Sequence, residues 1–209
     1  MIKSILQYFV AFILLSSCVS TKQSKVASDI EFSSSSRGGL VIGTVTFNYH
    51  KKKSPYDSYK FHLGYQSDDI EEVKKTSTYF NVNVNFFNGR FNGELNESKT
   101  FPFVLLQKPG VYNFNGFWFF WNGGMITKSY YNPVKFSLPF TVEKSKIVYI
   151  GNIVVNLKAE NTAYIEITDQ LSKDIGYFKK NYPNIDWNLT NNNTLKQGND
   201  GNGFIKLSK

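Results

Sequence analysis

The feature that most constrains the fold of this chain is an alternation of apolar and polar residues with a period of two. It is clearest where Phe80, Val82, Val84 and Phe86 are separated by single asparagines. Successive side chains of a β-strand point to opposite faces, so this pattern places the aromatic and aliphatic residues in a core and the asparagines in water. The alternation therefore predicts half-buried β-strands.

The same period recurs along the chain and predicts about seven or eight strands. Several are separated by residue pairs that tolerate positive φ, namely Asn88-Gly89, Asn92-Gly93 and Asn122-Gly123. Consecutive short strands with such turns favour an antiparallel sandwich, and an open barrel is the alternative. The strands are expected within residues 40–49, 59–65, 80–86, 103–106, 111–121, 134–142, 147–155 and 162–168.

One helix is predicted after these strands. Leu171, Ile175, Phe178 and Tyr182 recur at helical spacing, and Pro183 ends the pattern. The predicted fold class is therefore all-β, an antiparallel β-sandwich of about seven or eight strands with one C-terminal helix.

The N-terminus has the layout of an export signal. Lys3 precedes an apolar stretch over residues 5–15, which is too short to cross a membrane because a spanning helix needs roughly 20 apolar residues. The sequence Leu15-Ser16-Ser17-Cys18 resembles the lipobox of bacterial lipoproteins. The resemblance implies cleavage before Cys18, diacylglycerol on its sulfur and usually a third acyl chain on the new amine. Two or more acyl chains hold a protein at a membrane, whereas one binds only marginally.

Cys18 is the only cysteine in the chain, so no disulfide can form within it and the domain must be stable through its core alone. An ordinary secretory signal that happens to contain a cysteine is the alternative. Val19 occupies the position where aspartate accompanies inner-membrane retention in some Gram-negative lipoproteins, and residues 19–28 lack acidic residues that resemble surface-export signals. We therefore expect a lipid anchor in the outer membrane, facing the periplasm.

Composition divides the chain into four parts. Residues 1–17 are the signal peptide, and residues 18–39 are the lipidated cysteine with a flexible, serine-rich tether of roughly 25 Å reach. Residues 40–187 are the sandwich domain with its helix. Residues 188–209 are rich in asparagine and glycine, which predicts a mostly disordered tail.

The formal charge is +8, and removing residues 1–17 takes away only Lys3 and leaves +7. The densest basic run is Lys51-Lys52-Lys53, which could attract anionic lipid or polysaccharide or could be an ordinary solvated turn. Nucleic acid is not an expected partner, because Arg37 and Arg90 are the only arginines and the protein is expected to be exported. The expected partners are membrane lipid, through Cys18, and an envelope protein or glycan.

Two stretches resemble a family of bacterial lipoproteins. They are Lys108-Pro109-Gly110-Val111-Tyr112, and Phe140-Thr141-Val142 followed by residues 146–153, Lys-Ile-Val-Tyr-Ile-Gly-Asn-Ile. Uncharacterised lipoproteins with prealbumin-like or carboxypeptidase-regulatory-like β-sandwich domains carry a similar PGxY turn and GK-x-YxGxI strand. The resemblance covers residues 40–190 and implies a sandwich, without functional residues. Ser145 stands where that family has glycine.

No catalytic or metal-binding constellation emerges from the residue types. His50 and His62 are the only histidines, and both are expected on the surface, so a Ser-His-acid site or a zinc site lacks its parts. The acidic residues Asp68, Asp69, Glu71 and Glu72 are followed by lysines, which indicates a solvated segment rather than a hydrolase pair. Residues 200–205 match a calcium loop only in part. We expect no cofactor.

The most unusual segment is the aromatic run within residues 113–131. Alternation would send Trp118 and Phe120 to one face of a strand and Phe117, Phe119 and Trp121 to the other. The strand is either covered on both faces or exposes one aromatic face for binding. The candidate surface for a ligand or partner consists of Trp118, Trp121, Tyr130 and Tyr131.

These observations predict a non-catalytic, membrane-anchored envelope lipoprotein whose sandwich binds another envelope component. A carbohydrate-binding module that uses the exposed aromatics is the alternative, and a hydrolase built on the acidic cluster is a third hypothesis.

Overall fold

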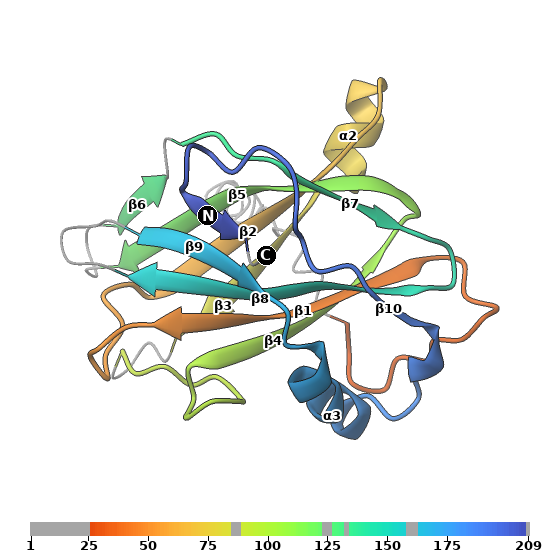
Figure 1. Ribbon diagram of the computed structural model, residues 1–209, viewed down its shortest axis with the longest axis horizontal. Coiled ribbons are helices and arrows are strands. Elements are labelled where there is room, and N and C mark those ends of the chain that lie inside the picture. Colours follow the sequence, from red (N-terminus) through yellow and green to blue (C-terminus); the bar gives the residue numbers. More distant parts are fainter. Residues whose placement is uncertain (1–25, 85–88, 123–126, 132–133, 158–162, 208–209) are drawn as a thin grey trace, which may run out of the picture.

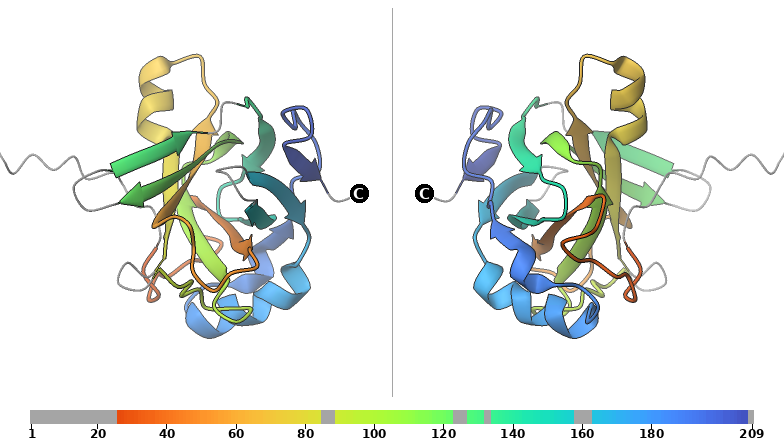
Figure 2. Two further views of the ribbon diagram at one scale, coloured as in Figure 1. Left: turned by 90° about the vertical axis from the view of Figure 1, so that its left-hand side faces the viewer. Right: turned by 90° about the vertical axis from the view of Figure 1, so that its right-hand side faces the viewer.

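The computed structural model describes residues 26–84, 89–122, 127–131, 134–157 and 163–207. Within these residues the chain is mostly β, and two sheets face each other around a common core (Figure 1). The two sheets are also seen in Figure 2, where β5 and β6 (green) lie on one side and β9 and β11 (blue) on the other. A sandwich-like fold is therefore confirmed.

The first sheet has six strands, with β11, β9, β8, β1 and β4 in that order and β10 beside β8. Its strands are β1 (Gly39–Asn48), β4 (Thr100–Gln107), β8 (Ile147–Leu157), β9 (Ala163–Thr168), β10 (Thr190–Asn192) and β11 (Ile205–Leu207). The second sheet has five strands, with β3, β2, β5 and β6 in that order and β7 also beside β5. Its strands are β2 (Ser58–Tyr65), β3 (Thr78–Asn83), β5 (Gly110–Asn122), β6 (Thr127–Tyr131) and β7 (Leu138–Val142).

Two details of the predicted fold class are wrong. The described residues form more strands than seven or eight, because β6, β10 and β11 lie outside the predicted segments. The six-stranded sheet is also mixed, since β1 and β10 run parallel to β8 and β11 runs parallel to β9. The turn residues in the sequence predict hairpins, which join strands that are neighbours in sequence. They cannot predict the parallel pairing of β1 with β8, because about a hundred residues separate these strands.

The core between the sheets is built by the predicted alternation. In β2, Tyr59, Phe61 and Leu63 are fully buried, and from the opposite sheet Ile153 and Val155 of β8 meet them in the same cluster. Burying one large apolar side chain contributes about 1.5–3 kcal/mol, so this disulfide-free core can hold the fold.

The predicted C-terminal helix is present as α3 (Leu171–Asn181). A second helix, α2 (Ile70–Thr76), was not predicted; the Asp69 side chain caps it by accepting hydrogen bonds from the backbone of Glu71 and Glu72. A single 3-10 turn, η1 (Trp187–Leu189), follows α3. None of the helices in the described part of the chain is long and apolar enough to cross a membrane.

A second core lies on the outer face of the six-stranded sheet, where α3 packs (Figure 1). Phe178 of α3 is fully buried there against a cluster that includes Leu40, Ile42 and Tyr149. The N-terminal arm, which we define as residues 26–36, completes this core. Its Phe32 is 2% exposed, pairs with Ile185 in a parallel bridge, and packs in the same cluster.

The prediction of a flexible tether therefore fails for residues 26–39, and residues 18–25 lie outside the described residues. The predicted disordered tail is likewise ordered over residues 188–207, where β10 and β11 pair with β8 and β9. Leu195 and Ile205 are 2% and 1% exposed. Composition misled in both places, because a segment with few apolar residues can still be ordered, residues 26–36 by burying Phe32 and residues 188–207 by pairing with β8 and β9.

The stretches that carry the family resemblance form turns and a strand irregularity. Ser145 adopts φ +59°, the left-handed conformation that glycine favours, and its hydroxyl donates to the Ser36 carbonyl at 2.6 Å. Gly151 has φ +110° and lies where the pairing of β8 with β1 shifts register around Gly43. A Cβ on Gly43 would lie 2.6 Å from the Gly151 carbonyl oxygen. This β-bulge separates an apolar half of the outer face from a polar half.

Candidate functional site

The aromatic run of β5 divides between the two faces of its sheet. Phe117 and Phe119 are 1% and 5% exposed and belong to the core between the sheets. Trp118 lies on the outer face, and Trp121 is 39% exposed near the end of the strand. Because alternation assigns Trp121 to the face of Phe119, the two tryptophans do not share one surface.

On the outer face, Trp118 belongs to an aromatic cluster, which we define as His62, Tyr79 and Trp118. The His62 and Tyr79 rings stack with centroids 4.4 Å apart, and Trp118 lies 6.2 Å from His62 and 5.7 Å from Tyr79. The three residues come from β2, β3 and β5, and the registers His62 to Tyr79 and His62 to Gly116 bring them together. All three are partly exposed.

Gly116 makes room for the indole of Trp118. A Cβ at this position would lie 2.4 Å from the far edge of the Trp118 ring and 2.8 Å from the His62 Cβ. The indole therefore lies back over the strand rather than standing up from it. Such a ring presents a broad apolar surface to the solvent side of the sheet.

Polar groups surround the aromatic cluster. Lys60 stands between Trp118 and Asn81 in the sheet register, and its ammonium lies 4.2 Å from the Tyr79 ring centre. The His62 Nδ1 is 2.7 Å from the Asn115 side-chain oxygen. Burial lowers the pKa of His62, although the Asn115 hydrogen bond acts in the opposite direction. His62 is therefore neutral at pH 7.

Hydroxyl and amide groups continue beyond the aromatic cluster on the same face. Ser58 of β2 donates a hydrogen bond of 2.8 Å to the Asn83 side chain of β3. Phe120, which pairs with Ser58 in the register, is partly exposed. We call the surface formed by the aromatic cluster and these neighbours the open face, because no described helix or strand packs over it (Figure 2). Its residues are Ser58, Lys60, His62, Tyr79, Asn81, Asn83, Trp118 and Phe120.

The other two predicted site residues lie in β6. The backbone of Tyr131 pairs with Trp118, and that of Tyr130 pairs with Phe119. The side chains of β6 lie outside the described residues. The backbone of β6, which contains Tyr130 and Tyr131, therefore lies directly beside the part of β5 that contains Trp118.

Comparisons with known proteins find no family model and no curated protein that matches this chain. Among solved structures, a leucine-rich repeat protein from Bacteroides thetaiotaomicron aligns with 79% of this chain at 13% identity and a TM-score of 0.31. A protein from Bacteroides fragilis, described in terms of cell adhesion, aligns with 64% of the chain at 9% identity and a TM-score of 0.30. The chain spans 19% of the first protein and 46% of the second.

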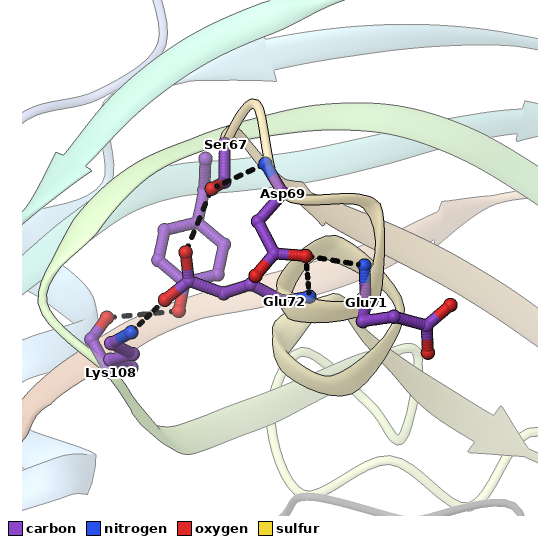
Figure 3. A network of polar contacts seen from close by, with 6 residues as sticks. Ser67, Asp69, Glu71, Glu72 and Lys108 are labelled. Atoms are coloured by element: carbon purple, nitrogen blue, oxygen red, sulfur yellow. Dashed lines mark hydrogen bonds and ion pairs between the residues drawn. The ribbon is translucent and has the colours of Figure 1, made fainter.

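The acidic cluster, considered above for a hydrolase, lies on α2 and the loop before it, and Figure 3 shows the contacts of Asp69 and Glu72. Asp69 caps the helix, Glu71 pairs with Lys74, and Glu72 accepts hydrogen bonds from Lys108 and Ser67. The hydrogen bond from Lys108, and to a smaller extent that from Ser67, holds the pKa of Glu72 below its usual range. All four carboxylates are thus on an exposed segment and are not arranged around a cleft.

The remaining candidates for chemistry are also surface features. His50 and the run Lys51-Lys52-Lys53 are exposed, as predicted. Within the part of the chain that the structure describes, no group of three or more His, Cys, Asp or Glu residues could hold a metal ion. Asp200 uses its backbone carbonyl to accept from Ile205 in a tight turn.

Sequence reasoning missed two members of the aromatic cluster. His62 alternates with Phe61 and Leu63 and was expected only as a surface residue, and Tyr79 was not singled out. The available signal was that both positions are aromatic where the pattern would accept any polar residue.

Proposed function

We propose that this protein is a non-catalytic lipoprotein of a bacterial envelope, anchored in the outer membrane through acylated Cys18 and facing the periplasm. In this proposal its sandwich binds glycan through the open face. The observation that carries the binding role is the aromatic cluster of His62, Tyr79 and Trp118 on a sheet face without a described covering element.

The composition of the open face favours a glycan as its ligand. Sugar rings have apolar C–H faces that pack on aromatic rings, and their hydroxyls pair with amides such as Asn81 and Asn83. Lys60 and the charge of +7 that remains without residues 1–17 favour an anionic chain over a neutral one. Since the face is a sheet surface rather than a deep pocket, an extended polysaccharide fits it better than a small molecule.

The anchor is tested by mass spectrometry of the protein purified from its native host. The expected result is an N-terminal peptide that begins at Cys18 and carries diacylglycerol. Cys18→Ser is expected to leave the protein unprocessed and without acyl chains. An unmodified Cys18 thiol in the wild-type protein would overturn this part of the proposal.

Glycan binding is tested by titrating the full chain with polygalacturonate, an anionic polysaccharide, and with neutral dextran of similar length. We expect polygalacturonate to change tryptophan fluorescence and dextran to have a smaller effect. Trp118→Ala should weaken binding by about thirtyfold or more, because truncating an aromatic anchor at the centre of a binding surface costs about 2 kcal/mol or more. Gly116→Ala should weaken it too, by displacing the indole.

Trp121→Ala is the matched control, since it removes the same residue type from the same strand but from the other face. Equal losses from Trp118→Ala and Trp121→Ala, or no binding across polygalacturonate, dextran and peptidoglycan, would overturn the assignment of a glycan to the open face. Crosslinking to an envelope protein through this face would instead identify a protein as its ligand.

A further inference from the structure

A polar cavity of about 430 Å³ lies on the opposite side of the sandwich from the open face, between the first turn of α3 and the six-stranded sheet. It is lined by side chains of β1, β4 and β8, of α3, and of the loop that precedes β4. Those used in the argument below are Thr46, Asn96, Thr100, Asn152, Lys173 and Asp174. We infer that this cavity binds a neutral, hydroxyl-rich ligand of monosaccharide size.

The β-bulge at Gly43 and Gly151 marks the start of the polar surface that lines the cavity. Before the bulge, the outer face of β1 carries Leu40 and Ile42, which α3 and its neighbours cover. After it, the same face carries Thr44 and Thr46. A buried hydroxyl costs free energy unless it is hydrogen bonded, and valine would fill the same space. Thr44 donates to Asp174 and so helps to hold α3, whereas Thr46 lines the cavity.

The side chains at the floor of the cavity are hydrogen bonded to one another but keep unused capacity. Thr46 donates to the Asn152 side-chain oxygen at 2.9 Å, so the 2.8 Å contact between Thr46 and Thr100 takes its proton from Thr100. Each hydroxyl has one proton to donate. The lone pairs of Thr100 and the amide nitrogen of Asn152 then remain for a ligand, since no described residue hydrogen bonds to them.

The charges around the cavity favour a neutral ligand. Asp174 is 7% exposed, and one of its carboxylate oxygens accepts from Thr44 at 2.8 Å and from Tyr149 at 2.7 Å. Lys173, the adjacent residue of α3, also lines the cavity and carries the opposite charge. A ligand with a net charge would meet one attractive and one repulsive group. A sugar offers closely spaced donors and acceptors without charge.

The loop beside the cavity is held in an unusual conformation. Asn96, Glu97 and Ser98 have φ values of +49°, +51° and +68°, which non-glycine residues rarely adopt. The Glu94 carboxylate accepts a hydrogen bond from Tyr177 of α3, which ties this loop to the helix. Strained backbone of this kind persists where the surrounding structure holds it in place. Here the strained loop places Asn96 at the cavity.

The test is saturation-transfer NMR and calorimetry of the full chain in detergent, with glucose, galactose and N-acetylglucosamine as neutral probes and glucuronate and glucosamine as charged ones. We expect at least one neutral sugar to bind more tightly than both charged ones. Thr46→Val and Asn96→Gly should each weaken binding by about tenfold, the effect of losing one or two hydrogen bonds. Glycine fits the positive φ of residue 96, so the loop should keep its shape.

Glu97→Gly is the matched control, because it changes a neighbouring left-handed residue that is exposed and does not line the cavity. It should leave the affinity unchanged, and so should Trp118→Ala, which separates this site from the open face. No binding of any neutral sugar, tighter binding of a charged one, or loss of binding only in Trp118→Ala would each overturn the inference. Thermal unfolding of each variant checks that it is folded.

Discussion

The outer faces of the two sheets carry large rings in similar positions but meet different surroundings. On the six-stranded sheet, Tyr149 is fully buried beneath α3 and the N-terminal arm, together with Leu40 and Ile42. On the five-stranded sheet, the Tyr79 and Trp118 rings contact each other in a tilted arrangement, and no described element covers them. The covered face carries aliphatic residues beside its rings, whereas the open face carries asparagine, serine and lysine. The neighbours of a ring, rather than the ring itself, therefore indicate whether a sheet face is core or surface.

The largest effect should come from the covered face. Phe178→Ala is expected to lower the free energy of unfolding by about 3–5 kcal/mol, because it leaves a cavity where a fully buried ring joins α3 to the sheet. Urea denaturation of the full chain measures it. Lys179→Ala, at the next and exposed position of α3, should change stability by less than about 0.5 kcal/mol. Equal effects of the two substitutions would show that α3 does not cover this face.

A smaller loss is expected from the polar half of the covered face. Thr44→Val preserves the shape of a fully buried side chain but removes one of the two hydroxyls that donate to Asp174. Leaving a buried carboxylate short of a donor should cost about 1–3 kcal/mol. Thr44→Ser keeps the donor and should be milder. A Thr44→Val protein as stable as the wild type would mean that α3 is not fastened to the sheet through Asp174.

On the open face, truncation should cost little stability. Trp118→Ala is expected to lower the free energy of unfolding by less than about 1 kcal/mol, since the ring is only partly buried. The adjacent Phe117→Ala, in the core between the sheets, should cost about 3–5 kcal/mol. If both cost the same, Trp118 is a core residue, and the contrast between the two faces disappears.

The smallest effect is a pH dependence confined to the covered face. Burial raises the pKa of Asp174 in the folded protein above its ordinary value. Between the pKa of the unfolded state and that of the folded state, the folded protein therefore binds more protons than the unfolded chain. Wild-type stability should fall over that range and stay lower above it. Asp174→Asn keeps an oxygen acceptor without a charge. We expect it to be at least as stable as the wild type at pH 7, with the difference vanishing near pH 3. A difference that grows towards low pH would contradict this.

Strand positions could be predicted from the sequence because alternation is a local signal. The predicted segments 59–65 and 147–155 lie within β2 and β8, and the helical spacing from Leu171 gives α3. The partners of the strands could not be predicted, since the parallel pairing of β1 with β8 depends on contacts distant in sequence. The predicted strand over residues 134–142 is present only from Leu138, although Phe136 before it is buried.

The candidate site was predicted only in part. Alternation in β5 correctly separates Trp118 from Phe117 and Phe119, but it does not say which neighbours a ring will meet. His62 and Tyr79 became part of the site only through the register of three strands. The polar cavity gave no sequence signal at all, because Thr46, Thr100 and Asn152 come together only once the bulge and α3 are in place.

The N-terminal arm limits how far the folded domain can lie from a membrane that holds Cys18. Its first described residue, Val26, donates a backbone hydrogen bond of 3.0 Å to Val104 of the edge strand β4, so the folded domain already begins there. If Cys18 holds the acyl chains, the path from the bilayer surface to that point is eight residues long, and a fully extended chain of that length covers at most about 28 Å. Any molecule that the protein captures would then be kept within a thin aqueous layer beside the lipid headgroups.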